Sequence, residues 1–267
     1  MEEVIKGTLM IIGGAEDKKN DCIILNRLID LANMRKGNII ILTAATEYPE
    51  RTAEEYINTF KNLGAVDIKA IHIESRQDAN NVNGCREISQ ASCIYMTGGD
   101  QLRITSIMGG TKAQQALYRA FDNGAVIAGT SAGASVMSET MITSGNDDDA
   151  PKKCTLKMAP GLGLLRDVVI DQHFAQRGRI GRLLAAIAQN PHMLGIGIDE
   201  DTGLIIGDDS VFEVIGSHAV TVIDGSHSDF SNVSELKPDE ILAITNVVMH
   251  VLPAGFKYNV RFRKPVV

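Results

Sequence analysis

Five short apolar runs, separated by longer segments of mixed polarity, set the pattern of the first half of this chain. The runs are rich in β-branched and small residues and occupy 7–14, 37–46, 66–74, 91–99 and 124–130. The segments between them repeat apolar residues at helical spacing, as Ile24, Leu28 and Leu31 do on one face of 21–36. Apolar strands that alternate with helices are typical of a parallel sheet covered on both faces. The sequence therefore predicts a doubly wound α/β sheet over this half.

After residue 131 the pattern changes to a charged loop, one helix and a series of short strands. The loop covers 144–153, the helix covers 177–190, and strand-like segments lie at 164–174, 192–227 and 241–253. Asp224 and Gly225 form a dipeptide that is typical of tight hairpin turns. Because no internal repeat or linker is visible, we expect one α/β domain over 1–267. Its sheet should be mostly parallel and flanked by helices, with a β-rich C-terminal extension.

The composition disfavours several classes of function. Only 4% of the residues are aromatic, so stacking platforms for nucleic acid are scarce, and the net charge of −7 disfavours non-specific phosphate binding, although a local basic cluster could still bind an anionic substrate. The N-terminus carries acidic residues where a secretory signal has basic ones, and no apolar run approaches the ~20 residues of a membrane span. The four cysteines show no spacing suited to zinc. We therefore expect a cytoplasmic protein with reduced thiols, no nucleic-acid or membrane partner and no metal.

The segment 129–133, Gly-Thr-Ser-Ala-Gly, matches a G-x-S-x-G pattern between a predicted strand and a predicted helix. In such an elbow the glycines allow a sharp turn and the serine hydroxyl is lifted to the carboxyl edge of the sheet, where open α/β sheets bind ligands. Ser131 is therefore a candidate nucleophile. The alternative is a tight turn in which Ser131 only caps the following helix.

A serine nucleophile needs a base, and His173 is the best placed of the six histidines. It lies near the end of the strand-like segment 164–174 and is followed by a segment rich in arginine, so it occupies an element boundary. Glu200 follows a buried strand-like segment and is the leading candidate for the acid that orients the imidazole. Asp148 and Asp149 in the charged loop are the alternative acids.

Backbone amides and charged side chains complete the candidate site. The amide of Ala132 begins the elbow helix, and Gly99 or Gly98 ends the strand before the elbow strand, so these amides are candidate donors to an oxyanion. Asp171 and Gln172 precede the histidine and offer acceptors for a cationic group. Three arginines that follow it suit carboxylate recognition, namely Arg177, Arg179 and Arg182.

Six segments, in this order, give the chain a close resemblance to the cyanophycinases and a more distant one to the aspartyl dipeptidases (dipeptidase E). They are residues 7–17, 97–103, 129–142, 158–165, 171–184 and 195–206. The Asp-Gln-His-Phe sequence with its three following arginines is far more specific than G-x-S-x-G, and the likeness covers nearly the whole chain.

This resemblance implies a serine-type exopeptidase that degrades cyanophycin, a polymer with a polyaspartate backbone and arginine side groups, to β-Asp-Arg dipeptides. It implies a catalytic triad of Ser131, His173 and Glu200. It also implies a substrate pocket lined by Gln101, Asp171, Gln172, Arg177, Arg179 and Arg182. The fold that it implies is a glutamine-amidotransferase-like α/β sheet, in a homodimer without metal or cofactor.

The chain departs from the family pattern at 144–154, where a glutamate-rich loop is expected and the sequence is rich in aspartate instead. If an acid of this loop completed the triad, it would be an aspartate with a shorter reach. Two other functions fit the same residues: a dipeptidase or amidase for another aspartyl peptide, and a non-catalytic binder of peptides rich in arginine or aspartate. A cysteine-dependent amidotransferase is disfavoured because the elbow carries Ser131 and no cysteine lies near it.

Overall fold

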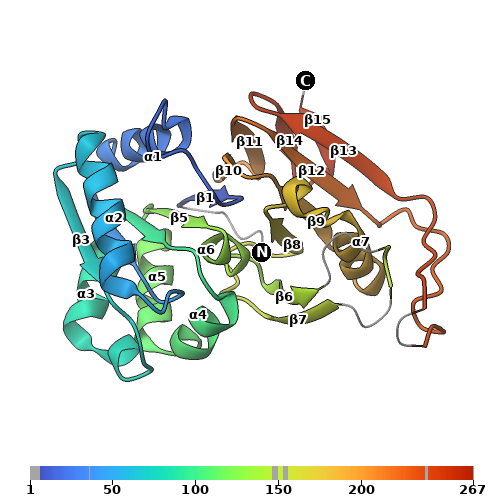
Figure 1. The fold of residues 1–267 in the computed structure, drawn as a ribbon, viewed down its shortest axis with the longest axis horizontal. Helices are drawn as coiled ribbons and strands as arrows, with labels where there is room; N and C mark the ends of the chain where they lie inside the picture. The colour runs from blue at the N-terminus through green and yellow to red at the C-terminus, as the bar shows by residue number, and fades with distance from the viewer. Residues whose placement is uncertain (1–6, 36, 146–149, 153–155, 238–239, 267) are drawn as a thin grey trace.

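A nine-stranded sheet with the order β15-β14-β11-β10-β1-β5-β4-β2-β3 forms the centre of the fold (Figure 1). The computed structural model describes residues 7–35, 37–145, 150–152, 156–237 and 240–266. The five apolar runs of the sequence are strands of this sheet: β1 (Thr8–Ile12), β2 (Asn38–Leu42), β3 (Asp67–Ile71), β4 (Cys93–Met96) and β5 (Val126–Thr130). They pair in parallel, as predicted.

β1 lies in the middle of the sheet, parallel to β5 and antiparallel to β10. The strands beyond it on that side are all antiparallel: β10 (Thr202–Ile206), β11 (Val211–Gly216), β14 (Lys257–Asn259) and β15 (Lys264–Val266). The α/β class and the β-rich C-terminal extension are thus confirmed. Because the extension adds antiparallel strands to the same sheet, the sheet is mixed rather than mostly parallel.

Helices cover both faces of the parallel half of the sheet (Figure 1). They are α1 (Ile23–Asn33), α2 (Pro49–Asn62), α3 (Val82–Gln90), α4 (Gln101–Met108) and α5 (Lys112–Asp122). Met10 and Ile12 of β1 belong to a core cluster with residues of α1 and α2, whereas Leu9 and Ile11 belong to one with residues of α3, α4 and α5. Each such side chain contributes about 1.5–3 kcal/mol when fully buried. Burial on two faces explains why β1, β2, β4 and β5 are almost continuously apolar, whereas β3, at the edge of the sheet, carries Asp67 and Lys69.

A second sheet has the order β13-β12-β9-β8. Its strands are β8 (Val168–Gln172), β9 (Leu194–Ile198), β12 (Ala219–Asp224) and β13 (Val248–Pro253). β8 and β9 are parallel, and the helix α7 (Ile180–Gln189) packs on this sheet through Leu183 and Ile187. The antiparallel pair β6 (Thr140–Gly145) and β7 (Leu156–Pro160) lies beside it, as Figure 1 shows.

One core cluster includes residues of both large sheets, for example Leu9 of β1 and Val220 of β12. On this ground we propose that residues 1–267 form a single domain. Within the described ranges, no helix combines the length and the apolar character that a transmembrane span requires.

The predicted hairpin at Asp224 and Gly225 is wrong. β12 ends at Asp224, but a long segment separates it from β13, its antiparallel neighbour. The Asp224 carboxylate instead accepts hydrogen bonds from the Ser226 amide (2.9 Å) and from Arg263 Nη1 (2.6 Å). A Cβ at Gly225 would lie 2.6 Å from Ile187 Cγ2, so this glycine allows close packing against α7 rather than a tight turn.

Candidate active site

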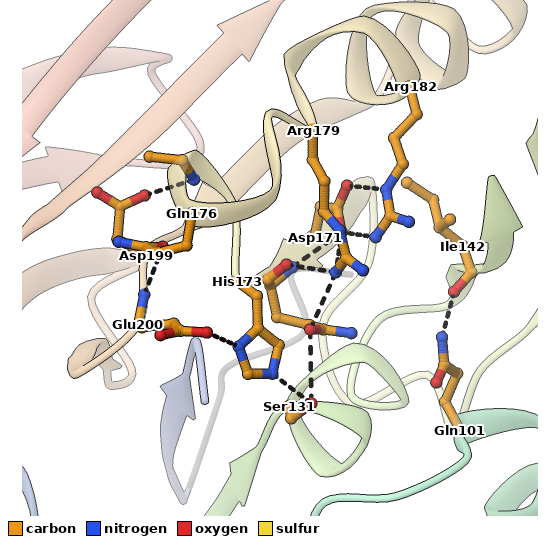
Figure 2. A network of polar contacts seen from close by, with 12 residues as sticks. Gln101, Ser131, Ile142, Asp171, His173, Gln176, Arg179, Arg182, Asp199 and Glu200 are labelled. Carbon is orange, nitrogen blue, oxygen red and sulfur yellow. Dashed lines mark hydrogen bonds and ion pairs between the residues drawn. The ribbon is translucent and has the colours of Figure 1, made fainter. Parts of the chain in front are cut away.

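The candidate nucleophile, base and acid follow the carboxyl ends of three strands (Figure 2). Ser131 follows β5, His173 follows β8, and Glu200 lies in the turn after β9. Ser131 Oγ is 3.0 Å from His173 Nε2, and His173 Nδ1 is 2.6 Å from Glu200 Oε1. Both distances are those of hydrogen bonds. The fold thus joins three residues that lie far apart in the sequence into one hydrogen-bonded chain.

Ser131 occupies a strained position between β5 and the single helical turn α6 (Ala132–Ser135). Its φ of 52° and ψ of −109° cost a non-glycine residue about 1–3 kcal/mol. The flanking glycines are sterically required, because a Cβ at Gly129 would lie 2.3 Å from the Gly133 carbonyl oxygen. In the described part of the chain, the Ser131 side chain makes no capping hydrogen bond to α6. The interpretation of Ser131 as a helix cap therefore does not hold.

The two ring nitrogens of His173 have different partners. The Glu200 carboxylate accepts a hydrogen bond from Nδ1, so in the neutral ring Nδ1 carries the proton and Nε2 presents a lone pair to the Ser131 hydroxyl. A general base that takes the serine proton needs this tautomer.

Burial lowers the pKa of the His173 imidazole below its ordinary value. The hydrogen bond from Nδ1 to Glu200 acts in the opposite direction, and the positive charges of Arg177 and Arg179 lower the pKa further. The ring is therefore neutral near pH 7, as a base must be.

Gly14 provides the space for the His173 ring. A Cβ at this position would lie 2.4 Å from His173 Cε1 and 2.5 Å from Nε2. The φ of Gly14 is +100°, a value that L-residues rarely adopt. The glycine pair after β1 thus has a role in the site that the sequence pattern did not reveal.

Only one member of the acidic cluster 199–201 faces the histidine. Asp199 accepts hydrogen bonds from the Ala175 amide (3.0 Å) and the Ala219 amide (3.2 Å), and Asp201 accepts one from the Asp17 amide (2.8 Å). The Glu200 side chain contacts His173. The backbone amide of Glu200 donates to Gln176 Oε1 (3.0 Å), a contact that the sequence did not predict. The alternative acids, Asp148 and Asp149, lie outside the described residues.

Two of the three amides expected to stabilise an oxyanion lie beside Ser131, namely those of Ala132 and Gly98. Within the described residues, the N–H groups of Ala132, Gly98 and Gly99 donate to no protein acceptor. A Cβ at Gly98 would lie 3.5 Å from Ser131 Cβ, whereas one at Gly99 would lie 2.2 Å from the Ala45 carbonyl oxygen. Gly98 thus borders the serine directly, and Gly99, the expected donor, packs against the neighbouring loop.

Asp171, Arg179 and Arg182, three of the residues expected to line the substrate pocket, form a buried network of ion pairs and hydrogen bonds. Asp171 is 1% exposed, and its carboxylate accepts from Arg182 Nε at 2.6 Å and from Arg182 Nη2, with Arg179 Nη1 3.6 Å away (Figure 2). Arg179 also donates to the Gln172 carbonyl oxygen (2.6 Å) and to Gln172 Oε1 (3.1 Å). Because Arg182 and Arg179 pair with the buried Asp171 carboxylate, this carboxylate is not free to bind a cationic group of a substrate.

Of the other expected substrate contacts, Gln172 is buried and Gln101 is half-buried. Arg177 is exposed on the 3₁₀ turn η2 (Ala175–Arg177) that follows His173. Gln172 Oε1 lies 3.4 Å from Ser131 Oγ and so links the serine to the Arg179 network. Gln101, the first residue of α4, donates from Nε2 to the Ile142 carbonyl oxygen (2.8 Å), and Figure 2 shows it apart from the triad.

Glu16 is a residue of the site region that the sequence analysis did not single out. Its side chain is buried and accepts hydrogen bonds from three hydroxyl groups, including that of Thr130, which directly precedes Ser131. Its place beside the glycine pair after the first strand is the one sequence signal that could have indicated it.

A cavity of about 740 Å³ lies elsewhere in the fold. Its lining includes Asp167, directly before β8, and Leu194, the first residue of β9. His173 and Glu200 follow the opposite ends of these strands. The triad is therefore not part of this cavity. Among the residues that the structure describes, no group of three His, Cys, Asp or Glu side chains could hold a metal ion.

Comparisons with known proteins agree with this architecture. The family described as Peptidase family S51 matches residues 9–214. The cyanophycinase of Geminocystis herdmanii is 34% identical over 267 residues, covering 100% of this chain and 98% of that protein. The cyanophycinase of Thermosynechococcus vestitus is 35% identical over 257 residues, covering 96% of this chain and 80% of that protein.

A solved structure shares the fold. The crystal structure of a peptidase from an acI-B1 actinobacterium superposes with a TM-score of 0.68 at 22% identity, over 96% of this chain and 97% of that one. The family match covers most of the chain, and the cyanophycinases align with nearly all of it. The chain therefore belongs to peptidase family S51.

Proposed function

We propose that this protein is a serine-type peptidase that degrades cyanophycin. The observation that carries the proposal is the hydrogen-bonded chain from Ser131 Oγ through His173 to Glu200, at the carboxyl edge of an α/β sheet. Sequence identity to cyanophycinases along nearly the whole chain supports the choice of substrate.

In the mechanism that we propose, Ser131 Oγ attacks a backbone carbonyl carbon of the polymer while His173 Nε2 takes the hydroxyl proton. Glu200 holds Nδ1 and stabilises the imidazolium that forms. The tetrahedral oxyanion accepts hydrogen bonds from the Ala132 amide and from Gly98 or Gly99, and loss of one such donor costs ~10²- to 10³-fold in rate.

The intermediate collapses when the C–N bond breaks and the leaving amine takes the proton from His173 Nε2. An acyl-enzyme on Ser131 remains. Water then attacks its carbonyl carbon, again with His173 as the base, and the free carboxylate leaves. No step requires a metal or an organic cofactor.

We further propose that the enzyme is an exopeptidase that releases β-Asp-Arg dipeptides. Arg177, exposed beside the base, is placed to pair with a free carboxylate of the polymer backbone. We propose that Gln172, whose Oε1 lies 3.4 Å from Ser131 Oγ, borders the substrate next to the nucleophile.

The test is an assay of the purified protein on cyanophycin, with the products identified by mass spectrometry. We expect β-Asp-Arg from the wild type and none from Ser131→Ala. Ser106→Ala is the matched control, because this serine is exposed on α4 and its hydroxyl donates to the local Arg103 carbonyl oxygen (3.0 Å). Full turnover by Ser131→Ala would overturn the nucleophile assignment.

The internal pairing of Asp171 favours one other function, a dipeptidase for aspartyl peptides that lack arginine. Arginine recognition was expected to rest on this carboxylate, which Arg182 and Arg179 occupy. Cleavage of small Asp-Xaa dipeptides, together with no release from the polymer, would establish this alternative.

The resemblance to cyanophycinases also leads us to propose a homodimer in the cytoplasm. Cys22 and Cys93 are free and buried, as reduced thiols would be. Light scattering on the purified protein would give a mass close to twice that of the chain, and a monomer at working concentrations would contradict the proposal.

A further inference from the structure

Residues 12–14, at the end of β1, accept backbone hydrogen bonds from the candidate nucleophile, from the candidate base and from the turn that carries the candidate acid. Three backbone N–H groups, one from each part, donate to three successive carbonyl oxygens: Ser131 to Ile12 (3.0 Å), His173 to Gly13 (2.8 Å) and Asp201 to Gly14 (2.9 Å). The three donors all have positive φ, of 52°, 47° and 45° respectively. Non-glycine residues keep such conformations only where the surrounding structure over-determines them. The end of β1 therefore sets the register of the nucleophile, the base and the turn that carries the acid.

Glu16 adds a side-chain contact from the same segment. It is 5% exposed, and its Oε1 accepts hydrogen bonds from the Tyr56 hydroxyl of α2 (2.6 Å) and the Tyr95 hydroxyl of β4 (2.8 Å). Its Oε2 accepts one from Thr130 Oγ1 at 2.6 Å. A buried carboxylate is unfavourable unless its oxygens are hydrogen-bonded, so it holds all three donors in place.

The two tyrosines give this carboxylate a rigid support. Their ring centroids are 4.8 Å apart, and the Phe60 ring packs edge-on against Tyr95 with its centroid 5.3 Å away. Burial raises the pKa of both tyrosine hydroxyls well above the ordinary value, and the nearby Glu16 acts in the same direction. Both hydroxyls therefore stay protonated and act as donors. With Oε1 fixed by the tyrosines, Oε2 faces the elbow strand.

We propose that Glu16 is a positioning residue for Ser131. Its carboxylate holds the Thr130 side chain, and Thr130 is bonded directly to the strained nucleophile. The Ser131 amide is held from the same segment through Ile12, so the elbow is fixed on both sides of the peptide bond between Thr130 and Ser131. Glu16 thereby keeps Ser131 Oγ within reach of His173 Nε2 without touching the substrate.

This inference rests on the proposed function only in taking Ser131 as the nucleophile, and it does not depend on which peptide is cleaved. The test therefore uses a fluorophosphonate probe, which reacts with an activated serine whatever the natural substrate is. The labelling rate reports the alignment of Ser131 with its base, and thermal unfolding measured in parallel reports stability.

Thr130→Val removes the hydroxyl that Glu16 binds and keeps the shape of the side chain. Thr111→Val is the matched control. Thr111, directly before α5, is also buried, and its hydroxyl also makes a short hydrogen bond, to the carbonyl oxygen of Met108 (2.6 Å) at the end of α4. Because a displacement of about 1 Å can cost ~100-fold in rate, we expect labelling of Thr130→Val to be ~10- to 100-fold slower than that of the wild type. Thr111→Val should lose stability but keep its labelling rate.

Two further variants separate positioning from folding. Glu16→Gln keeps an acceptor for the tyrosines but puts an amide donor in place of the oxygen that accepts from Thr130, so it should slow labelling less than Thr130→Val does. Thr130→Ser restores a hydroxyl and should recover most of the lost rate. If the wild type is labelled and both Thr130→Val and Glu16→Gln are labelled as fast as Thr111→Val, the role of Glu16 is overturned and the proposed function stands. A wild type that resists the probe overturns the nucleophile, and with it the positioning role.

Discussion

His173 Nδ1 lies 2.6 Å from Glu200 Oε1, yet the pKa of His173 is below its ordinary value of 6.5. Burial of the imidazole has the largest effect and outweighs the carboxylate's preference for the charged ring. The pair is thus arranged to orient a neutral ring rather than to keep it protonated.

The first prediction concerns the acid limb of the pH profile. Because the base acts only when neutral, we expect kcat/KM to fall with decreasing pH through a midpoint below 6.5. Glu200→Gln removes the carboxylate that raises the pKa of His173. The acid limb of the variant's pH profile should therefore lie at a lower pH than that of the wild type, and its kcat should be lower. A wild-type midpoint above 6.5 would contradict this view of the site.

The free energy of unfolding should also depend on the protonation of His173. The unfolded ring binds a proton at a higher pH than the buried ring, so the folded state loses stability as pH falls through 6.5. Urea unfolding of the wild type and of His173→Gln at several pH values checks the sign, since the variant lacks this contribution.

The second prediction concerns Gly14, whose missing Cβ makes room for the His173 ring. Gly14→Ala should lower kcat ~100-fold or more, because a methyl group would displace the imidazole. Gly64→Ala is the matched control: Gly64 has a φ of +91°, close to the +100° of Gly14, but a Cβ there meets nothing within 4 Å. Both variants should lose about 1–2 kcal/mol of stability from the positive φ, and only Gly14→Ala should lose activity. Equal activities would show that the ring tolerates the methyl group.

The third prediction concerns the strain at Ser131. Ser131→Gly and Ser131→Ala both remove the nucleophile, so both should be inactive. Glycine relieves the backbone strain at φ 52°, whereas alanine does not, so Ser131→Gly should be more stable than Ser131→Ala by about 1 kcal/mol. Urea unfolding at pH 7 measures the difference. If the alanine variant is the more stable, the elbow does not store strain.

The fourth prediction separates buried from exposed arginines. Arg182→Met leaves part of the buried Asp171 carboxylate unpaired and should destabilise the protein by about 3–5 kcal/mol. Arg177→Met changes an exposed side chain, so the free energy of unfolding should change by about 0.5 kcal/mol or less. Its effect should fall on KM for the polymer instead. A large loss of stability in Arg177→Met would show that Arg177 has a structural partner.

The parallel half of the fold could be predicted because its buried strands β1, β2, β4 and β5 carry almost continuous apolar runs. The antiparallel half could be predicted only as a β-rich extension, since β14 and β15 are three residues each and have little hydrophobic pattern. The Asp-Gly dipeptide at 224–225 misled because its aspartate binds Arg263 and its glycine accommodates Ile187. Both are tertiary contacts that a local turn pattern does not contain.

In the candidate site too, local sequence predicted some features, and contacts between distant segments determine the others. Ser131, His173 and Glu200 could be named because each follows a strand-like segment, but their contact depends on the order of the strands in space. Asp171 and Arg182 were expected to contact the substrate, since nothing in a sequence distinguishes a charge paired in the interior from one exposed to a ligand. Glu16 was missed for the same reason: its three hydroxyl partners come from distant segments.

The central place of β1 has a consequence for how the protein matures on the ribosome. This strand is synthesised before its neighbours β5 and β10, and the turn with Glu200 directly precedes β10. A nascent chain therefore carries Ser131 before the acid and the closing strand emerge. The proposed peptidase activity requires synthesis past β10, so fragments that end before this strand are expected to be inert.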